Sequence, residues 1–262
     1  MAKKKTSRTL PAGKPSRGAR RATVGKSPSK RPAGPATLCI DIGGTGLKLI
    51  VLDATGQPLG ERTRVATPHP ATPRALLGAL GKEIAGQPGF DRVSVGFPGV
   101  VVGGVTLTAP NLGEGFAGFR FERAIERMTG KPTRVCNDAD VQGLAAVGGR
   151  GVEMVITLGT GMGSGLYLDG KLVPNLELAH HVFRGDKTYE EHVGKKALAR
   201  VGKKRWRKRV RDVAEHLAPV FNYATLYVGG GNARLLHAED LPRNVKIVSN
   251  EAGLLGGLAL WR

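Results

Sequence analysis

Two segments of the chain share one pattern, in which a short apolar strand, a glycine-rich turn and a second strand follow one another. The first spans residues 38–52 and the second residues 153–168. Segments with helical spacing and further short strands lie between and after them. Hairpins of this kind join antiparallel strands and do not occur in a purely parallel sheet. The pattern therefore predicts an α/β fold of two related halves, each built on a mixed sheet.

The composition is that of a globular protein. Of 262 residues, 40% are hydrophobic and 23% are charged, and the 39 Gly follow no Gly-X-Y repeat. No run approaches the ~20 apolar residues of a transmembrane helix. The basic N-terminus is not followed by the apolar stretch of a secretory signal. Two Cys are too few for a disulfide framework, so we expect a cytoplasmic protein with no membrane partner.

The formal net charge of +19 comes from two segments. Residues 1–36 hold eleven of the 40 Lys and Arg, residues 195–211 hold ten more, and neither segment contains an acid. Residues 1–36 are also poor in large apolar side chains, which predicts a disordered basic tail. The tail is either a solubilising, non-specific polyanion-binding segment or a dedicated binding segment, and the composition leaves both open.

Two glycine turns are candidate phosphate sites, because phosphates bind backbone N–H groups that side chains would block. They are Asp41-Ile-Gly-Gly-Thr45 and Leu158-Gly-Thr-Gly161. Neither is a Walker loop, since no Gly-Lys-Ser/Thr follows, and neither opens a helix as a dinucleotide fingerprint does. A single glycine hairpin is most often only a tight turn. Two, each with Thr between or after glycines, favour phosphate binding.

These turns, with Asn137-Asp138, Glu177-Leu-Ala-His180 and Gly229-Gly-Gly231, resemble the ROK family of sugar kinases. The resemblance runs from about Leu38 to Arg262 and keeps the order of the family's motifs. It implies an actin/hexokinase-like (ribonuclease H-like) two-domain fold with mixed sheets around a central cleft. We expect residues 37–110 plus 249–262 to form a small α/β domain and residues 111–248 a large one.

The resemblance can be narrowed to the polyphosphate glucokinase branch, which the segment from Glu177 to Trp206 is similar to. It implies transfer of a phosphoryl group from inorganic polyphosphate, and also from ATP, to the 6-hydroxyl of glucose, with Mg²⁺. Family members commonly carry a Cys-rich zinc motif, but no Cys follows Cys136 here, so no zinc is expected. Ala179 stands where Gly is expected, and its methyl group would crowd the sugar.

The resemblance assigns Asp138 as the catalytic base that accepts the proton of the sugar hydroxyl. The start of a helix should keep its carboxylate ionised, and the alternative is an acid that only complements the helix dipole. Asp41 would help to hold Mg²⁺. The expected phosphate or nucleotide ligands are Asp41, Gly43, Gly44, Thr45, Lys48, Gly159, Thr160, Gly161, Gly229 and Gly230. Lys48 has the alternative of a solvated strand lysine.

Sugar hydroxyls are recognised by paired hydrogen bonds from carboxylate, amide and imidazole groups. The positions that match the family's sugar site are Gly99, Asn111, Asn137, Asp138, Glu177, His180 and Glu190. Gly99 would let the sugar approach the backbone. Glu191 suits a helix capping box better than a sugar contact.

The basic segment 195–211 is unusual because ordinary protein surfaces mix charges of both signs. Polyphosphate carries a negative charge on each phosphate and suits a row of Lys and Arg. We expect a polyphosphate track formed by Lys195, Lys196, Lys203, Lys204, Arg205 and Lys208. A solvated helix face and a site for nucleic acid or another polyanion are the alternatives.

Three rival functions remain at this point. One is a strictly ATP-dependent hexokinase or glucomannokinase of the same family. Another is a sugar-responsive regulator, but residues 1–36 are too short for the DNA-binding domain that precedes the fold in such proteins. The third is a nucleic-acid-binding protein, which would not need Asp138. The resemblance implies a homodimer, and nucleic acid is expected only non-specifically, through the basic tail.

Overall fold

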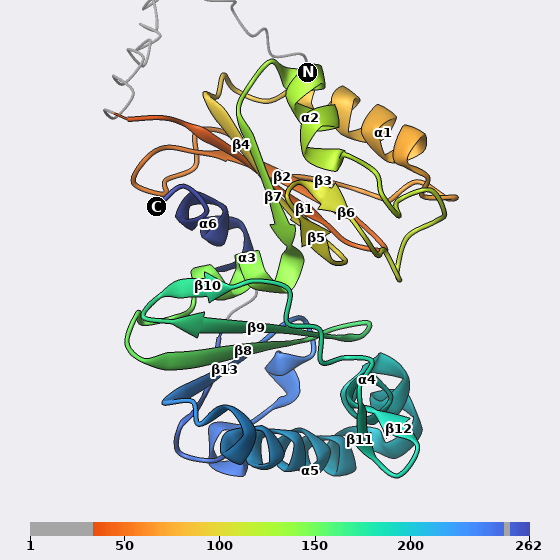
Figure 1. Ribbon diagram of the computed structural model, residues 1–262, viewed down its shortest axis with the longest axis vertical. Coiled ribbons are helices and arrows are strands. Elements are labelled where there is room, and N and C mark those ends of the chain that lie inside the picture. The colour runs from red at the N-terminus through yellow and green to blue at the C-terminus, as the bar shows by residue number, and fades with distance from the viewer. Residues whose placement is uncertain (1–33, 249–251) are drawn as a thin grey trace, which may run out of the picture. The chain divides into compact units, whose positions relative to one another are not determined.

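The computed structural model describes residues 34–248 and 252–262, which form two five-stranded sheets of the same topology (Figure 1). In each sheet a three-stranded antiparallel meander continues into two parallel strands. The first sheet has the order β3 (Thr63–Val65), β2 (Leu47–Leu52), β1 (Thr37–Ile42), β4 (Arg92–Phe97), β7 (Thr133–Asn137). The second has the order β10 (Lys171–Val173), β9 (Met162–Leu168), β8 (Val152–Leu158), β13 (Thr225–Gly229), β14 (Val245–Ile247). The shared order confirms the predicted mixed sheets and related halves.

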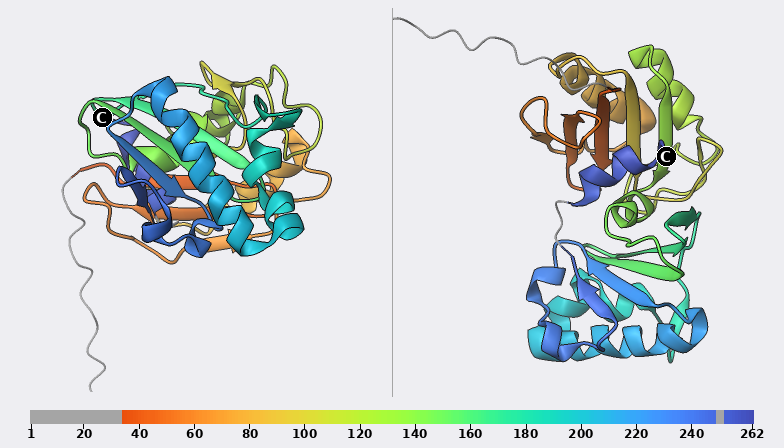
Figure 2. Two further views of the ribbon diagram at one scale, coloured as in Figure 1. Left: turned by 90° about the horizontal axis from the view of Figure 1, so that it is seen from below. Right: turned by 90° about the vertical axis from the view of Figure 1, so that its left-hand side faces the viewer.

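Helices cover both faces of the sheets (Figures 1 and 2). On the outer side of the first sheet lie α1 (Pro73–Ala85) and α2 (Phe121–Thr129), and on the outer side of the second lies α5 (Lys195–Phe221). Each sheet with its helices is called a lobe. Between the two sheets lie α3 (Asp138–Leu144) and α6 (Ala252–Ala259). The smaller elements are β5 (Val101–Val102), β6 (Val105–Thr106), β11 (Val182–Arg184), β12 (Lys187–Thr188), α4 (Tyr189–Val193), η1 (Ala233–Leu235) and η2 (Ala238–Asp240).

The apolar run of β1 is buried on both faces. Leu38 and Ile40 pack with Leu76 of α1 and Phe121 of α2, whereas Cys39 faces α6, where it packs in a cluster with Leu258. Strands covered on both sides read as nearly continuous apolar runs instead of alternating ones. This explains why β1 is so apolar in the sequence.

The second core lies under α5. Trp206, Val210, Val213 and Leu217 are fully buried and pack in one cluster with the β8, β9 and β13 side chains. Their steps of four and three place them on one face of the helix, as the sequence predicts. Gly202 has a φ of 75° and interrupts the helical backbone, so the predicted division of this segment is also found.

The first sheet reaches further along the chain than expected. Residue 110 is the end of the first domain in the sequence-based division, but β7 pairs in parallel with β4, from Val93 opposite Thr133 to Phe97 opposite Asn137. Because β7 has only five residues, its sequence does not show which sheet it joins. Helix α6 packs against β1 and β4, in the same lobe as expected for residues 249–262.

Residues 1–33 of the predicted basic tail lie outside the described residues. Among the residues that the structure describes, none of the helices combines the length and the apolar character that a membrane crossing requires.

Helices α3 and α6 approach each other so closely that side chains are excluded between them. A Cβ atom at Gly256 of α6 would overlap the carbonyl oxygen of Val141 in α3, and one at Gly143 would overlap the hydroxyl of Tyr167. Glycine at these positions lets α3, which carries Asp138, lie between α6 and the second sheet.

We predict that Gly256→Ala lowers the free energy of unfolding by about 1–3 kcal/mol, the range for overpacking a tight interface. Gly78→Ala is the matched control, because Gly78 is exposed within α1 and an added Cβ there meets nothing within 4 Å. The control should raise stability by about 0.5–1 kcal/mol through helix propensity. Urea unfolding measures both, and equal midpoints for the two variants would contradict the close α3–α6 contact.

Candidate active site

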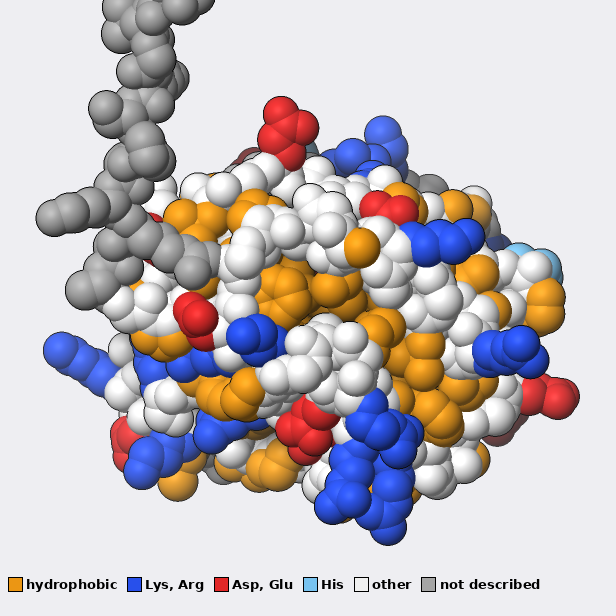
Figure 3. Space-filling model, turned by 90° about the horizontal axis from the view of Figure 1, so that it is seen from above, with side chains coloured by type: hydrophobic (Ala, Val, Ile, Leu, Met, Phe, Trp, Pro, Cys, Tyr) orange, Lys and Arg blue, Asp and Glu red, His pale blue; other side chains and the backbone are white. Residues whose placement is uncertain are grey.

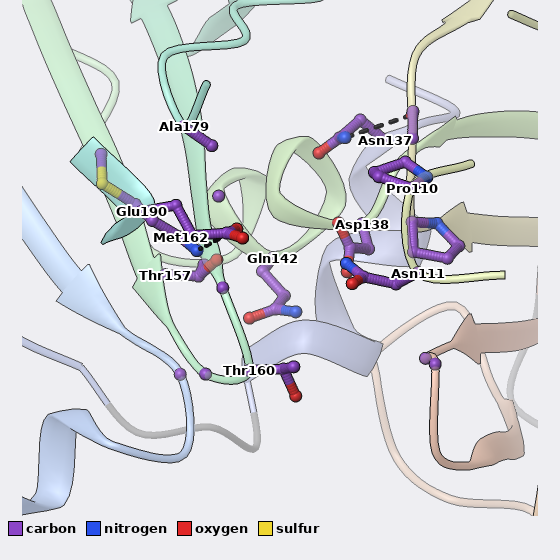
Figure 4. A pocket seen from close by; sticks show the side chains of 18 of the residues that line it. Pro110, Asn111, Asn137, Asp138, Gln142, Thr157, Thr160, Met162, Ala179 and Glu190 are labelled. Carbon is purple, nitrogen blue, oxygen red and sulfur yellow. Dashed lines mark hydrogen bonds between the residues drawn. The ribbon is translucent and has the colours of Figure 1, made fainter. Parts of the chain in front are cut away.

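A cavity of about 340 Å³ is walled by elements of both lobes (Figure 4). Its walls come from the β1–β2 turn, the β8–β9 turn, the start of α3 and the loops around residues 98–111 and 177–190. A cavity of this size can enclose a small ligand. It brings together the predicted residues Asp41, Gly43, Gly44, Thr45, Lys48, Gly99, Asn111, Asn137, Asp138, Gly159, Thr160, Gly161, Glu177, His180, Glu190 and Gly230.

Gly229 is the predicted site residue that does not line this cavity, and Gly231 lines it instead. Gly229 is the buried last residue of β13, where a Cβ would lie 3.2 Å from the Val248 side chain. Gly230 has a φ of 87°, and a Cβ there would lie 2.5 Å from the Leu158 backbone. The first glycine of the triplet thus serves packing, and the turn toward the cavity begins one residue later.

The β1–β2 turn packs closely against the loop that carries Asn111. The Gly43 N–H donates to the Gly46 carbonyl at 2.9 Å and closes the turn. At Gly44 a Cβ would lie 2.9 Å from the Asn111 carbonyl oxygen, so a side chain there would push the two loops apart. Lys48 donates to Asp41 Oδ2 at 2.5 Å. Lys48 is therefore an ion-paired, partly exposed residue of the cavity wall, and its contact to a phosphate stays a prediction.

The β8–β9 turn is packed against Glu190 and the start of α5. The Gly159 N–H donates to the Gly161 carbonyl at 3.0 Å, and the Lys195 N–H donates to the Thr160 carbonyl at 3.1 Å. The Met162 N–H donates to Glu190 Oε2 at 3.3 Å, and a Cβ at Gly161 would overlap that carboxylate. Glu190, expected to be a sugar ligand, thus also supports the β8–β9 turn.

Asp138 is the first residue of α3 and lies half-buried on the cavity wall. Its Oδ1 accepts a hydrogen bond from the Ala139 N–H at 2.8 Å. Burial, with a smaller contribution from the charge of Asp41, raises the pKa of Asp138 to about 7. Desolvation thus outweighs the hydrogen bond at the helix terminus, so the helix start favours the ionised form of this carboxylate less than expected.

The Asn137 side chain joins α3 to the loops that carry Gly99 and Glu177. Its Nδ2 donates to the Gly99 carbonyl at 3.2 Å and to Glu177 Oε1 at 3.1 Å. Its Oδ1 accepts from the Ala139 and Asp140 N–H groups and caps the helix. The amide therefore holds the site together as well as lining it.

Gly99 lines the cavity, and its lack of a side chain also serves the packing of the chain. A Cβ at this position would overlap the Thr108 carbonyl oxygen, so the glycine permits a close approach of two chain segments. Burial raises the pKa of Glu177, and the neighbouring His180 partly offsets this effect. The Ala179 methyl group lies on the cavity wall, at the place where crowding of a sugar was expected (Figure 4).

Several residues of the cavity wall are not among those expected from the sequence. They are Pro98, Pro110, Gln142, Thr157, Met162, Gly163 and Gly231, together with Ala179, which the sequence marks only as a departure. Gln142 had a signal, since it follows Asp138 by four residues and one helical turn brings such positions to the same face. The others come from loops and strands whose direction the sequence does not show.

The basic segment on α5 begins at the β8–β9 turn. The six predicted track residues Lys195, Lys196, Lys203, Lys204, Arg205 and Lys208 are all exposed. Within the described part of the chain, no side-chain hydrogen bond or ion pair engages any of the six. The other four cations of the segment contact neighbouring groups: Arg200 the Glu191 carbonyl, Arg207 Asp240, Arg209 the His192 carbonyl and Arg211 the Asp240 carbonyl.

This arrangement differs from the surface at the α1–α2 end of the protein. There, Lys and Arg are interspersed with Asp, Glu and apolar side chains (Figure 3). On α5, Lys195 and Lys196 precede the break at Gly202, and Lys203, Lys204, Arg205 and Lys208 follow it. The segment thus starts beside Thr160 and carries six exposed positive charges that have no side-chain partner in the described part of the chain.

Comparisons with known proteins agree on one family. Residues 37–177 match the ROK family. The chain is 32% identical over 237 residues to a polyphosphate glucokinase of Mycobacterium tuberculosis (strain CDC 1551 / Oshkosh), covering 83% of this chain and 88% of the relative. It is similar to the crystal structure of an inorganic polyphosphate/ATP-glucomannokinase from Arthrobacter sp. strain KM, with a TM-score of 0.77, 34% identity, and 87% of this chain and 100% of the other covered.

A ROK family glucokinase from Streptomyces griseus, solved with glucose and AMPPNP, shares the fold. The TM-score is 0.70 at 21% identity, with 86% of this chain and 98% of the other covered.

We predict that Asp138→Asn lowers turnover with a sugar acceptor and a phosphate donor by at least ~10²-fold, the lower range for loss of a general base. In the unmodified protein, kcat/KM should fall below about pH 7, because only the ionised Asp138 can accept a proton and its pKa is raised to about 7. Steady-state rates between pH 5.5 and 8.5 measure this.

Glu215→Gln is the control, because this exposed carboxylate of α5 lies outside the cavity wall. It should leave both turnover and the pH profile unchanged. Near-normal turnover of Asp138→Asn, or a profile without an acid limb, would refute the role of Asp138.

Proposed function

The chain belongs to the ROK family, and from this premise we propose that it is a glucokinase that uses inorganic polyphosphate and ATP as phosphoryl donors. The observation that carries the proposal is the course of α5. Six exposed cations of this helix make no side-chain hydrogen bond or ion pair to the described residues, and the helix starts at the β8–β9 turn, against the same cavity that holds Asp138. The relatives named as polyphosphate enzymes support the same donor.

The reaction joins the 6-oxygen of glucose to the terminal phosphorus of the donor. The O–P bond to glucose forms as the bridging O–P bond to the rest of the donor breaks, and the leaving oxygen keeps that electron pair. The hydroxyl proton passes to the Asp138 carboxylate. Little covalent chemistry is asked of the protein in such a transfer, so positioning and charge compensation dominate.

Positioning of glucose falls to the side chains near Asp138. Asn111 and His180 line the cavity, and Glu177 is held there by Asn137. These groups can donate to or accept from neighbouring sugar hydroxyls. Glu190 reaches the cavity from the opposite side, where it accepts from the Met162 N–H. Glucose between these groups would present its 6-hydroxyl to Asp138.

Donor phosphates would be held by the two glycine turns, with Thr45 and Thr160 adding hydroxyl groups. The residues present suit Mg²⁺, which binds through one or two carboxylates with phosphate oxygens and water as its other ligands. Asp41 has one carboxylate oxygen on Lys48, and its other oxygen is the expected ligand. When bound, Mg²⁺ would neutralise charge on the donor phosphates. The expected homodimer and cytoplasmic location stay predictions.

The assay that tests the function compares two donors. The full-length protein with glucose and Mg²⁺ should form glucose 6-phosphate with nucleotide-free polyphosphate alone and with ATP alone. EDTA should abolish both activities and added Mg²⁺ should restore them.

Product with ATP but none with polyphosphate would favour a strictly ATP-dependent hexokinase or glucomannokinase. No product with either donor would overturn the proposal. Stoichiometric zinc in the purified protein would contradict the zinc-free expectation.

A second experiment tests the track on α5. Neutralising Lys203, Lys204, Arg205 and Lys208 together should raise KM for long-chain polyphosphate strongly and KM for ATP much less. Polyphosphate contacts many screened charges, whereas the glycine turns hold the few phosphates of ATP. Added salt should have the same donor-selective effect. Trp206 stays intact because it is part of the buried core.

The matched control neutralises Arg62, Arg74, Arg127 and Lys131, four cations of the first lobe that lie outside the cavity wall. It should leave both KM values unchanged. Equal effects of the α5 variant on the two donors would show that the track is an ordinary helix surface.

A further inference from the structure

Helix α3 directs two side chains into the cavity, Asp138 and Gln142. Both line the wall, whereas Ala139, Asp140, Val141 and Gly143 are buried in the packing of the helix. A spacing of four residues places Asp138 and Gln142 on one face of the helix. Gln142 is therefore one helical turn from the proposed catalytic base, on the same side of the cavity.

The position of the Gln142 amide is the second observation. In Figure 4 the side chain extends into the cavity between Asp138 on one side and Thr157 and Met162 on the other, with Thr160 nearby. Its amide group makes no hydrogen bond to any other described residue, and the side chain is half-buried. By contrast, the Asn137 amide is engaged at both its nitrogen and its oxygen.

The charges around Gln142 indicate what an amide does there. Asp41, Asp138, Glu177 and Glu190 bring four carboxyl groups to the cavity wall, and the one lysine on that wall, Lys48, is bound to Asp41. A phosphoryl group that enters this wall needs N–H donors. A cation next to Asp138 would lower the pKa of the base and weaken it as a proton acceptor, whereas a neutral amide donates without that effect.

We propose that the Gln142 amide nitrogen donates a hydrogen bond to the phosphoryl group in transfer, between the proposed base and the β8–β9 turn. The inference rests on the proposed function and adds a ligand of the reacting group to it. Hydrogen bonds aimed at the transferring group stabilise the charge that develops on its oxygens in the transition state. The same group is transferred from polyphosphate and from ATP. The contribution of Gln142 is therefore independent of the donor, unlike that of the track on α5.

The test measures kcat and KM of Gln142→Ala and Gln142→Glu with both donors. Loss of one such donor costs about 10²–10³-fold in kcat where it has been measured in other enzymes. We expect Gln142→Ala to lose at least ~10-fold in kcat, equally with polyphosphate and with ATP, and to keep KM for glucose within about twofold. Gln142→Glu keeps the shape but places a carboxylate against the phosphoryl group, so its loss should be larger.

Gln57→Ala is the matched control, because Gln57 is exposed and does not line the cavity. It should leave kcat unchanged, and thermal unfolding should show that all variants fold. A merely structural role of Gln142 would not spare KM for glucose while lowering kcat equally for two donors.

Three results would overturn the inference. Normal kcat in both Gln142 variants of an otherwise active enzyme would show that the amide does not touch the reacting group. A raised KM for glucose with unchanged kcat would make Gln142 a sugar ligand. An unmodified protein inactive with both donors would overturn the proposed function and this inference with it, which separates that failure from the first two.

Discussion

Four hydrogen bonds from one buried side chain hold the cavity in shape. Asn137 donates to the Gly99 carbonyl and to Glu177, and accepts from the N–H groups of Ala139 and Asp140. The first bond reaches the loop after β4, the second reaches the loop after β10, and the last two begin α3. Because Asp138 is the next residue, the direction of its carboxylate depends on all four. An unsatisfied buried amide is costly, so the side chain strongly favours this one arrangement.

The two sheets of equal topology explain why the glycine turns, the proposed phosphate sites, occur in a pair. In each sheet the hairpin between the first two strands ends in a glycine turn, and the cavity wall includes both turns. Backbone N–H groups at both turns can therefore approach the same ligand. Several carboxyl groups lie in the same wall. Burial, together with repulsion between these groups, raises the pKa of Asp138. Such a site favours a ligand that brings cations or is held by directed N–H donors.

Close backbone packing holds α3, the short helix that begins with Asp138, in its place. Gly256 and Gly143 remove the side chains that would separate α3 from α6 and from Tyr167. The Tyr167 hydroxyl in turn donates to the Asp140 carbonyl at 2.7 Å. Asp140 itself is buried with one carboxyl oxygen that has no partner in the described part of the chain, and burial raises its pKa to about 7. The environment of α3 thus disfavours the charged form of both Asp138 and Asp140.

Much of this protein follows from local pattern. The apolar runs and glycine turns of β1–β2 and β8–β9 predict the hairpins, because strand and turn preferences act over a few residues. The buried stripe of α5 and the break at Gly202 follow from helical spacing. The motif set places sixteen residues in one cavity wall although they are spread from Asp41 to Gly230. The order of the motifs along the chain and their resemblance to a known family predicted this grouping. Hydrophobic periodicity predicts elements and cannot show which distant residues meet.

Contacts between distant segments decided the rest. Whether β7 joins the first sheet depends on pairing with β4, and the removal of Gly229 from the site depends on its packing against Val248. The sequence has ten cations on α5, but neighbours such as Asp240 and the Glu191 carbonyl determine that four are engaged, while six have no side-chain partner among the residues that the structure describes. The raised pKa of Asp138 and the place of Gln142 in the cavity belong to the same class. The charge state and the accessibility of a side chain depend on neighbours from both sheets and their helices, which only the tertiary structure brings together. The sequence alone was sufficient to predict the main strands and helices, the two glycine turns and the residue types at the site, because these depend on local pattern.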